Sequence, residues 1–259
     1  METDFNYRKN VVLLIIHAPE EQYTFEELKQ VFSSERAVHI NKDLYINSYQ
    51  IAKSHINSIR IIAYSRTTKH PDLTWLSVDD PGFLECNKKS YSSMLSMAMS
   101  LAFNTGCERL VYINHLCPYI NKEHIDFAFS NISEKNAVIG ASNKGEIYMF
   151  GTSRENMKLF DNFSPFKENL LSEIIEQAKK NKINITGMEE LNLIKDEDSL
   201  KKWLENKTMR SAIFTGFANK SAALPLENVP SNHKKKKKHV ENAIETNTDN
   251  NQQNQAQQS

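Results

Sequence analysis

Short apolar runs rich in β-branched residues alternate along this chain with segments of helical period, and this alternation limits the possible folds most strongly. Strands are expected at Val11–Ile16, Ser58–Tyr64, Leu110–Ile113, Ala137–Gly140, Glu146–Gly151 and Ile183–Thr186, with a further short one through Leu73, Trp75 and Leu76. Helices are expected at Phe25–Phe32, Asp43–His55, Ser92–Phe103, Asn121–Ile132, Leu170–Lys180 and Asp198–Asn206. Right-handed βαβ crossovers would join these strands into one sheet between two helical layers. The sequence therefore predicts a three-layer α/β domain with a mostly parallel sheet and an antiparallel element near its middle.

Composition indicates the class of protein to which this domain belongs. The chain has 259 residues, 39% of them hydrophobic and 25% charged, which suits one sizeable core in a soluble protein. The longest apolar runs are too short to span a membrane and the N-terminus lacks the features of a signal peptide, so we expect a cytoplasmic protein without membrane contact. The three cysteines, Cys86, Cys107 and Cys117, lack metal-site spacing and are expected to be reduced and mostly buried.

The C-terminal part differs from the rest in composition. Residues 224–259 contain a five-lysine run, Lys234–Lys238, followed by a stretch rich in Asn and Gln. Such a segment has too little apolar surface to offset its ordering entropy, so we predict a disordered tail after a domain at residues 8–220. The lysine run has no interleaved aromatic residues for base stacking, so nucleic-acid binding is the least favoured function. The role of residues 208–223 and the oligomeric state stay open.

Polar residues follow the predicted strand Leu110–Ile113 directly and lead into Cys117 and Pro118. Ligands of open α/β sheets bind beyond the carboxyl ends of parallel strands, so Asn114, His115 and Leu116 are predicted ligand-binding residues. The chain contains no recognisable glycine-rich phosphate loop and no hydrolase or metalloprotease motif. With seven glycines in all, little room remains for a backbone phosphate cradle.

Four blocks of the chain carry a resemblance to a known family. Gly106–Pro118 has the spacing of a G-x-x-R-V-V-L-I-G-S-D-C-P motif, and Gly140–Gly151 that of G-P-A-E-D-G-G-Y-Y-L-I-G. Leu159–Lys167 corresponds to L-F-x-x-I-x-W-G-T, and Leu193–Leu200 to D-V-D-T-P-E-D-L. In these motifs the chain resembles, from Ser93 to Leu200, the small bacterial glycosyltransferase-A-like (GT-A-like) proteins, a family of unknown function related to nucleotide-sugar transferases and nucleotidyltransferases. The N-terminal strand followed by Ala18-Pro19 is also similar to the family's entry to its nucleotide loop.

The chain keeps the family's residues at positions that shape the fold, but not at positions that would bind a metal or a nucleotide. The retained positions are Gly106, Arg109, Cys117, Pro118, Gly140, Gly145, Tyr148, Gly151, Leu159 and Phe160. The family's aspartate before Cys-Pro is Leu116 here, its Glu-Asp pair is Asn143-Lys144, and its late aspartates are Leu193 and Lys195. Its basic loop after the first strand is the acidic Thr24–Glu27, which also has the spacing of a helix capping box.

The lost positions decide the functional prediction. The resemblance implies Mg²⁺ or Mn²⁺ held between carboxylates and a substrate diphosphate, but leucine cannot bind a hard cation and lysine repels one. We therefore predict no metal site and a degenerate domain that acts by binding a nucleotide or nucleotide-sugar, or a protein partner, rather than as an enzyme. Asn143 and Lys144 join Asn114, His115 and Leu116 as predicted ligand-binding residues. The alternative is an active nucleotide-sugar or nucleotidyl transferase with a rearranged, metal-independent site, in which His115 and Lys144 are the catalytic candidates.

Overall fold

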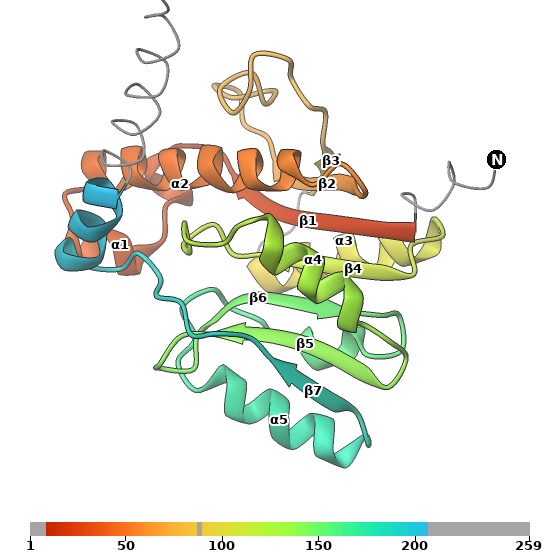
Figure 1. Cartoon of the computed structure of the whole chain (residues 1–259). Helices are drawn as coiled ribbons and strands as arrows, with labels where there is room; N and C mark the ends of the chain where they lie inside the picture. The colour runs from red at the N-terminus through yellow and green to blue at the C-terminus, as the bar shows by residue number, and fades with distance from the viewer. Residues whose placement is uncertain (1–8, 87–89, 207–259) are drawn as a thin grey trace, which may run out of the picture. The chain divides into compact units, whose positions relative to one another are not determined.

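The computed structural model describes residues 9–86 and 90–206, all within one unit of the chain. Its centre is a seven-stranded sheet in the order β3-β2-β1-β4-β6-β5-β7 (Figure 1). The strands are β1 (Asn10–His17), β2 (Ile59–Ser65), β3 (Leu84–Glu85), β4 (Arg109–Ile113), β5 (Asn136–Ala141), β6 (Ile147–Thr152) and β7 (Asn184–Gly187). Neighbouring strands pair in parallel except at β6, which is antiparallel to both β4 and β5. The predicted mostly parallel sheet with an internal antiparallel element is confirmed.

Two helical layers cover the sheet, as predicted. The helices are α1 (Glu26–Val31), α2 (Ser34–Ser54), α3 (Tyr91–Asn104), α4 (Lys122–Asn131) and α5 (Leu170–Lys180), with short 3-10 turns at Glu21–Tyr23 and Met157–Phe160. Residues 197–206 are also helical. Successive side chains of a strand point to opposite faces, so β1 contributes Val12 and Leu14 to one core and Leu13 and Ile15 to the other. The first core is covered by α1, α2, α4 and residues 197–206, and the second by α3 and α5.

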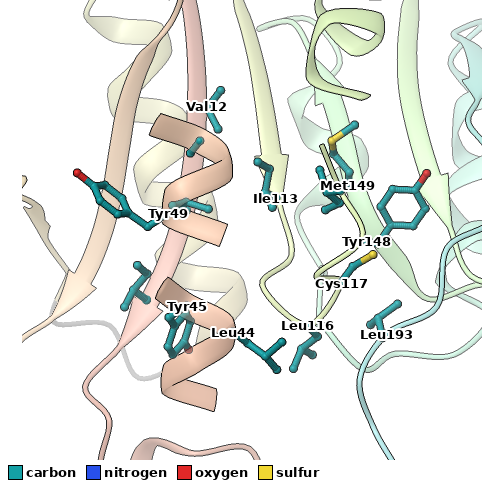
Figure 2. Packing of buried hydrophobic residues seen from close by; sticks show 14 of the residues in the cluster. Val12, Leu44, Tyr45, Tyr49, Ile113, Leu116, Cys117, Tyr148, Met149 and Leu193 are labelled. Atoms are coloured by element: carbon teal, nitrogen blue, oxygen red, sulfur yellow. The ribbon is translucent and has the colours of Figure 1, made fainter. Parts of the chain in front are cut away.

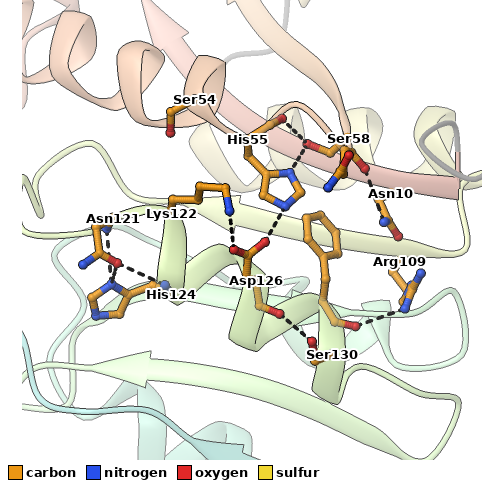
Figure 3. A network of polar contacts seen from close by, with 12 residues as sticks. Asn10, Ser54, His55, Ser58, Arg109, Asn121, Lys122, His124, Asp126 and Ser130 are labelled. Carbon is orange, nitrogen blue, oxygen red and sulfur yellow. Dashed lines mark hydrogen bonds and ion pairs between the residues drawn. The ribbon is translucent and has the colours of Figure 1, made fainter.

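A polar network ties α2 to α4 across the first core (Figure 3). His55, at the end of α2, bonds Ser58 Oγ through Nδ1 at 2.8 Å and Asp126 Oδ1 of α4 through Nε2 at 3.0 Å. Lys122 donates to Asp126 Oδ2 at 2.8 Å, and this ammonium holds the pKa of the Asp126 carboxyl below its usual range. Asn121 caps α4 as predicted, because its side-chain oxygen accepts the His124 N–H at 3.1 Å.

Three local predictions are wrong. Thr24 does not form a capping box, because its hydroxyl donates to the Glu20 carbonyl at 3.0 Å and α1 begins with no side-chain cap. The second helix starts at Ser34 rather than Asp43, since Ser33 caps it by accepting the Arg36 N–H. Residues 73–76 form turns rather than a strand, and the edge strand lies instead at Leu84–Glu85.

The other elements agree with the prediction to within a few residues. The predicted tail at 224–259, residues 208–223 and the last part of the predicted 8–220 domain lie outside the described residues. None of the helices in the described part of the chain has the length and apolar character that crossing a membrane requires.

Candidate functional site

The order of the strands reverses between β1 and β4, because β2 and β3 lie on one side of β1 whereas β4 and the later strands lie on the other. Such a reversal opens the crevice in which open α/β sheets bind their ligands. The residues at this point are His17, which ends β1, and Asn114 and His115, which follow β4.

Asn114 is fully buried and all its polar atoms are used by the backbone. Its Nδ2 donates to the carbonyls of Ile147 at 3.1 Å and Pro165 at 3.3 Å. Its Oδ1 accepts the Leu116 N–H at 3.1 Å. Asn114 therefore holds the loop after β4 in place, and no polar atom of its side chain is left to bind a ligand.

His115 is also buried, between two aromatic rings. Its ring stacks on Tyr45 with centroids 4.0 Å apart and lies 5.7 Å from Phe25 on the other side. Nε2 bonds Asn41 Oδ1 at 2.9 Å, while Nδ1 has no partner among the described residues. Burial, with a smaller contribution from His17, lowers the pKa of His115 well below its usual range. His115 is a neutral, enclosed ring, which fits a packing role better than that of a general base.

Aromatic rings fill the space beyond β1 and β4. We call them the aromatic cluster: His17, Phe25, Tyr45, Tyr91, His115 and Phe166. Phe25 lies at its centre, with ring centroids 5.1 Å from Phe166 and 5.9 Å from Tyr91. Phe25 comes from the segment before α1, where the resemblance implied a basic nucleotide loop. The crevice thus presents packed rings where phosphates would need cationic or amide donors.

The free energy of unfolding is expected to fall as the pH is lowered from about 6.5 to about 4, because His17 of the aromatic cluster is buried. Burial lowers the pKa of His17 from 6.5 to about 4. Between these pH values the unfolded chain binds a proton at His17 that the folded chain does not. The free energy of unfolding therefore falls by about 1.4 kcal/mol for each unit by which the pH is lowered. Urea unfolding of the wild type and His17→Phe between pH 4 and 7 measures the difference in slope. Parallel curves for wild type and His17→Phe contradict the assignment.

Leu116 and Leu193, two positions where the resemblance expects carboxylates, lie close together in the structure. Leu116 is fully buried, and Figure 2 shows it between Leu44 of α2 and Leu193. The Ile194 N–H donates to the Leu116 carbonyl at 2.7 Å, which joins the loop after β4 to the segment after β7. Two separate departures from the family motif therefore lie together in one apolar region, and this hydrogen bond makes the contact between their segments.

Lys195 lies next to this contact and pairs with a buried carboxylate. Its ammonium is 2.6 Å from Glu146 Oε1, and the Glu146 side chain is only 3% exposed. The Ser142 hydroxyl donates to the other oxygen, Oε2, at 2.7 Å. Glu146 therefore has one cation and one hydroxyl already bound, both supplied by the chain itself.

A polar cavity of about 290 Å³ opens beside this ion pair. Its lining includes Asn143, Lys144, Glu146, Lys195 and Lys202. Lys144 is more than half exposed and lies 3.9 Å from Glu168, a loose contact. Of the predicted ligand-binding residues, Asn143 and Lys144 line this cavity, whereas Asn114, His115 and Leu116 are buried elsewhere.

The donor set at this site does not fit Mg²⁺ or Mn²⁺. These ions require several oxygen ligands, but Leu116 and Leu193 supply none and the Lys195 ammonium occupies Glu146. Across residues 9–86 and 90–206, no group of three His, Cys, Asp or Glu side chains is arranged to hold a metal ion. The sequence predicted Glu146 only as the start of a strand and Lys195 only as a lost aspartate. Their opposite charges, at two positions of the family motifs, were the signal that could have predicted the pair.

Comparison with known proteins shows the fold. No protein-family model matches the chain, and no curated protein matches it. The structure is similar to that of a protein from Desulfovibrio desulfuricans G20 classed as a nucleotide-diphospho-sugar transferase, with a TM-score of 0.61 and 17% identity over 73% of this chain and 83% of that one. It is also similar to a nucleotidyl transferase from Methanothermobacter thermautotrophicus, with a TM-score of 0.54 and 8% identity over 78% of this chain and 99% of the other. The predicted GT-A-like, nucleotide-diphospho-sugar transferase-like fold is confirmed.

Proposed function

We propose that this protein binds a nucleotide or nucleotide-sugar without a divalent cation and does not carry out metal-dependent transfer. One observation carries the proposal: Lys195 pairs with the buried Glu146 beside the part of the core that contains Leu116 and Leu193. A chain that had only lost ligands would leave Glu146 without a counter-charge. Here the ammonium supplies the positive charge that an ion would otherwise bring, so the site is electrostatically complete without metal.

The polar cavity is the proposed ligand site. Its lining contains three carboxylates, those of Glu146, Asp196 and Asp198. Glu146 is bound by Lys195, and Asp196 accepts the Ser199 N–H at 2.7 Å at the start of the helix 197–206. Lys144 and Lys202 also line the cavity. Ammonium groups form charge-assisted hydrogen bonds with phosphate oxygens, which favours a phosphorylated ligand over a neutral one.

A second candidate function is metal-independent transfer. The position of Lys144 favours it, because an ammonium in the polar cavity could offset the charge that develops on a diphosphate leaving group. His115 has no part in this version, since its ring is enclosed in the aromatic cluster. Release of nucleoside diphosphate in the presence of EDTA, lost in Lys144→Ala, would favour this candidate.

Thermal unfolding with UDP-glucose, GDP-mannose and CTP, each in Mn²⁺ and in EDTA, tests the proposal. A ligand at about 100 times its Kd adds roughly 2.7 kcal/mol, so the melting temperature should rise by several degrees, equally under both conditions. Lys202→Ala should reduce the shift, whereas Lys201→Ala, one residue away and outside the cavity lining, should not. A larger shift in Mn²⁺ than in EDTA contradicts cation independence. No shift with any of the probes contradicts the nucleotide ligand.

A further inference from the structure

One edge of the sheet is open to another strand. Among the described residues β7 pairs only with β5, and it is the last strand in the sheet (Figure 1). The N–H groups of Asn184 and Met188 donate towards β5, at 2.8 and 2.9 Å. Backbone groups alternate in direction along a strand, so those of Ile185 and Gly187 point away from the sheet. The opposite edge differs, because β3 has only two residues and offers little backbone for pairing.

An apolar groove lies beside this open edge. It is a cavity of about 520 Å³ between α5 and β7. Its apolar lining includes the half-buried side chains of Leu171, Ile175, Ile183, Ile185 and Met188. An unpaired strand edge next to half-buried aliphatic side chains is a template for a further strand and the side chains that come with it.

Charge is distributed unevenly along β7. Lys179, Lys180 and Lys182 precede the strand at the end of α5, and Glu189 and Glu190 follow it. Lys179 and Glu190 both line the groove. The start of the edge is therefore positive and its end negative. A partner strand that places negative charge beside the start of β7 and positive charge beside its end would complement this edge. A second copy of β7, running antiparallel to the first, does so.

We propose that this edge is a homodimer interface in which β7 pairs antiparallel with β7 of a second copy about a two-fold axis. With Thr186 on the axis, Ile185 faces Gly187 of the partner subunit, and the outward N–H and C=O groups of both residues form hydrogen bonds. The same register brings Lys182 towards Glu190 of the partner subunit. The sheet becomes continuous across both copies, and the two α5 helices approach over the groove. This proposal is independent of the proposed ligand.

Sedimentation of the full chain over a range of micromolar concentrations tests the interface. The expected result is a reversible monomer–dimer equilibrium. Glu190→Lys places lysine opposite Lys182 in both copies, and should weaken the dimer by about tenfold or more. Lys182→Glu should weaken it similarly, while the double variant Lys182→Glu/Glu190→Lys should restore it. Glu35→Lys, an exposed charge reversal on α2, provides the control and should leave the dimer intact.

A backbone variant checks the strand pairing independently of charge. Ile185→Pro removes an N–H that points away from β5, so the monomer should fold while the dimer is lost. Circular dichroism verifies the fold, and Ile185→Val, which keeps the N–H, should still dimerise. A protein that sediments as a monomer at every concentration, or a dimer that neither charge reversal nor Ile185→Pro affects, overturns the proposal.

Discussion

Replacing Leu116 by aspartate is expected to lower the free energy of unfolding by about 4 kcal/mol, because it buries a carboxylate in an apolar contact. Leu116 is fully buried in the same core as Leu44 and Leu193. Its carbonyl already accepts the Ile194 N–H, and its N–H already donates to Asn114 Oδ1. The neighbouring Lys195 ammonium is already bound to Glu146, so it does not compensate the new charge. Urea unfolding at neutral pH measures the loss.

Measuring the stability of Leu116→Asp with and without Mn²⁺ shows whether this position lies in an apolar core or faces a metal site that has lost a ligand. We expect Leu116→Asp to be equally unstable with and without Mn²⁺, because Lys195 still occupies Glu146 and Leu193 supplies no oxygen ligand. The control Leu116→Met keeps the volume and polarity, and should cost less than about 1.5 kcal/mol. Near-normal stability of Leu116→Asp, or its recovery on adding Mn²⁺, would mean that this position still faces a cation site.

Replacing Lys195 by methionine is expected to cost about 3 kcal/mol, at the low end for a broken buried ion pair because the lysine is partly exposed. The exposed fractions are 25% for Lys195 and 3% for Glu146. Without the ammonium, Glu146 keeps only the Ser142 hydroxyl as a side-chain partner. The cost therefore arises mainly from the glutamate that stays buried, not from the lysine that is removed.

A double-mutant cycle tests this assignment. Glu146→Gln in the Lys195→Met background removes the buried charge, so the double variant should recover most of the lost stability. Lys144→Met, at a neighbouring lysine with a loose, exposed contact, should change stability by less than about 0.5 kcal/mol. Additive costs in the cycle would show that Lys195 and Glu146 do not interact energetically.

The regular elements were predictable because their causes are local. The strand at Leu110–Ile113 and the helix at Leu170–Lys180 follow from short β-branched runs and helical period, and both were located closely. The start of α2 at Ser34 was not predicted, because the amphipathic pattern of this part of the helix is weak. It depends on the Ser33 cap and on apolar side chains that contact the sheet. The turns at 73–76 also carry apolar residues, since Leu73 and Leu76 are buried in the core although the backbone there is irregular.

The fold class and the loss of metal-binding residue types follow from the amino-acid sequence alone, since a leucine or lysine at a motif position excludes a carboxylate in any conformation. The contacts that replaced the metal ligands depend on the folded chain. Leu116 and Leu193 are far apart along the chain, as are Glu146 and Lys195, and folding makes each pair a contact. It also placed Asn114 and His115 inside the protein and Asn143 and Lys144 at a cavity, because burial depends on which elements pack above a loop and not on the residues within it.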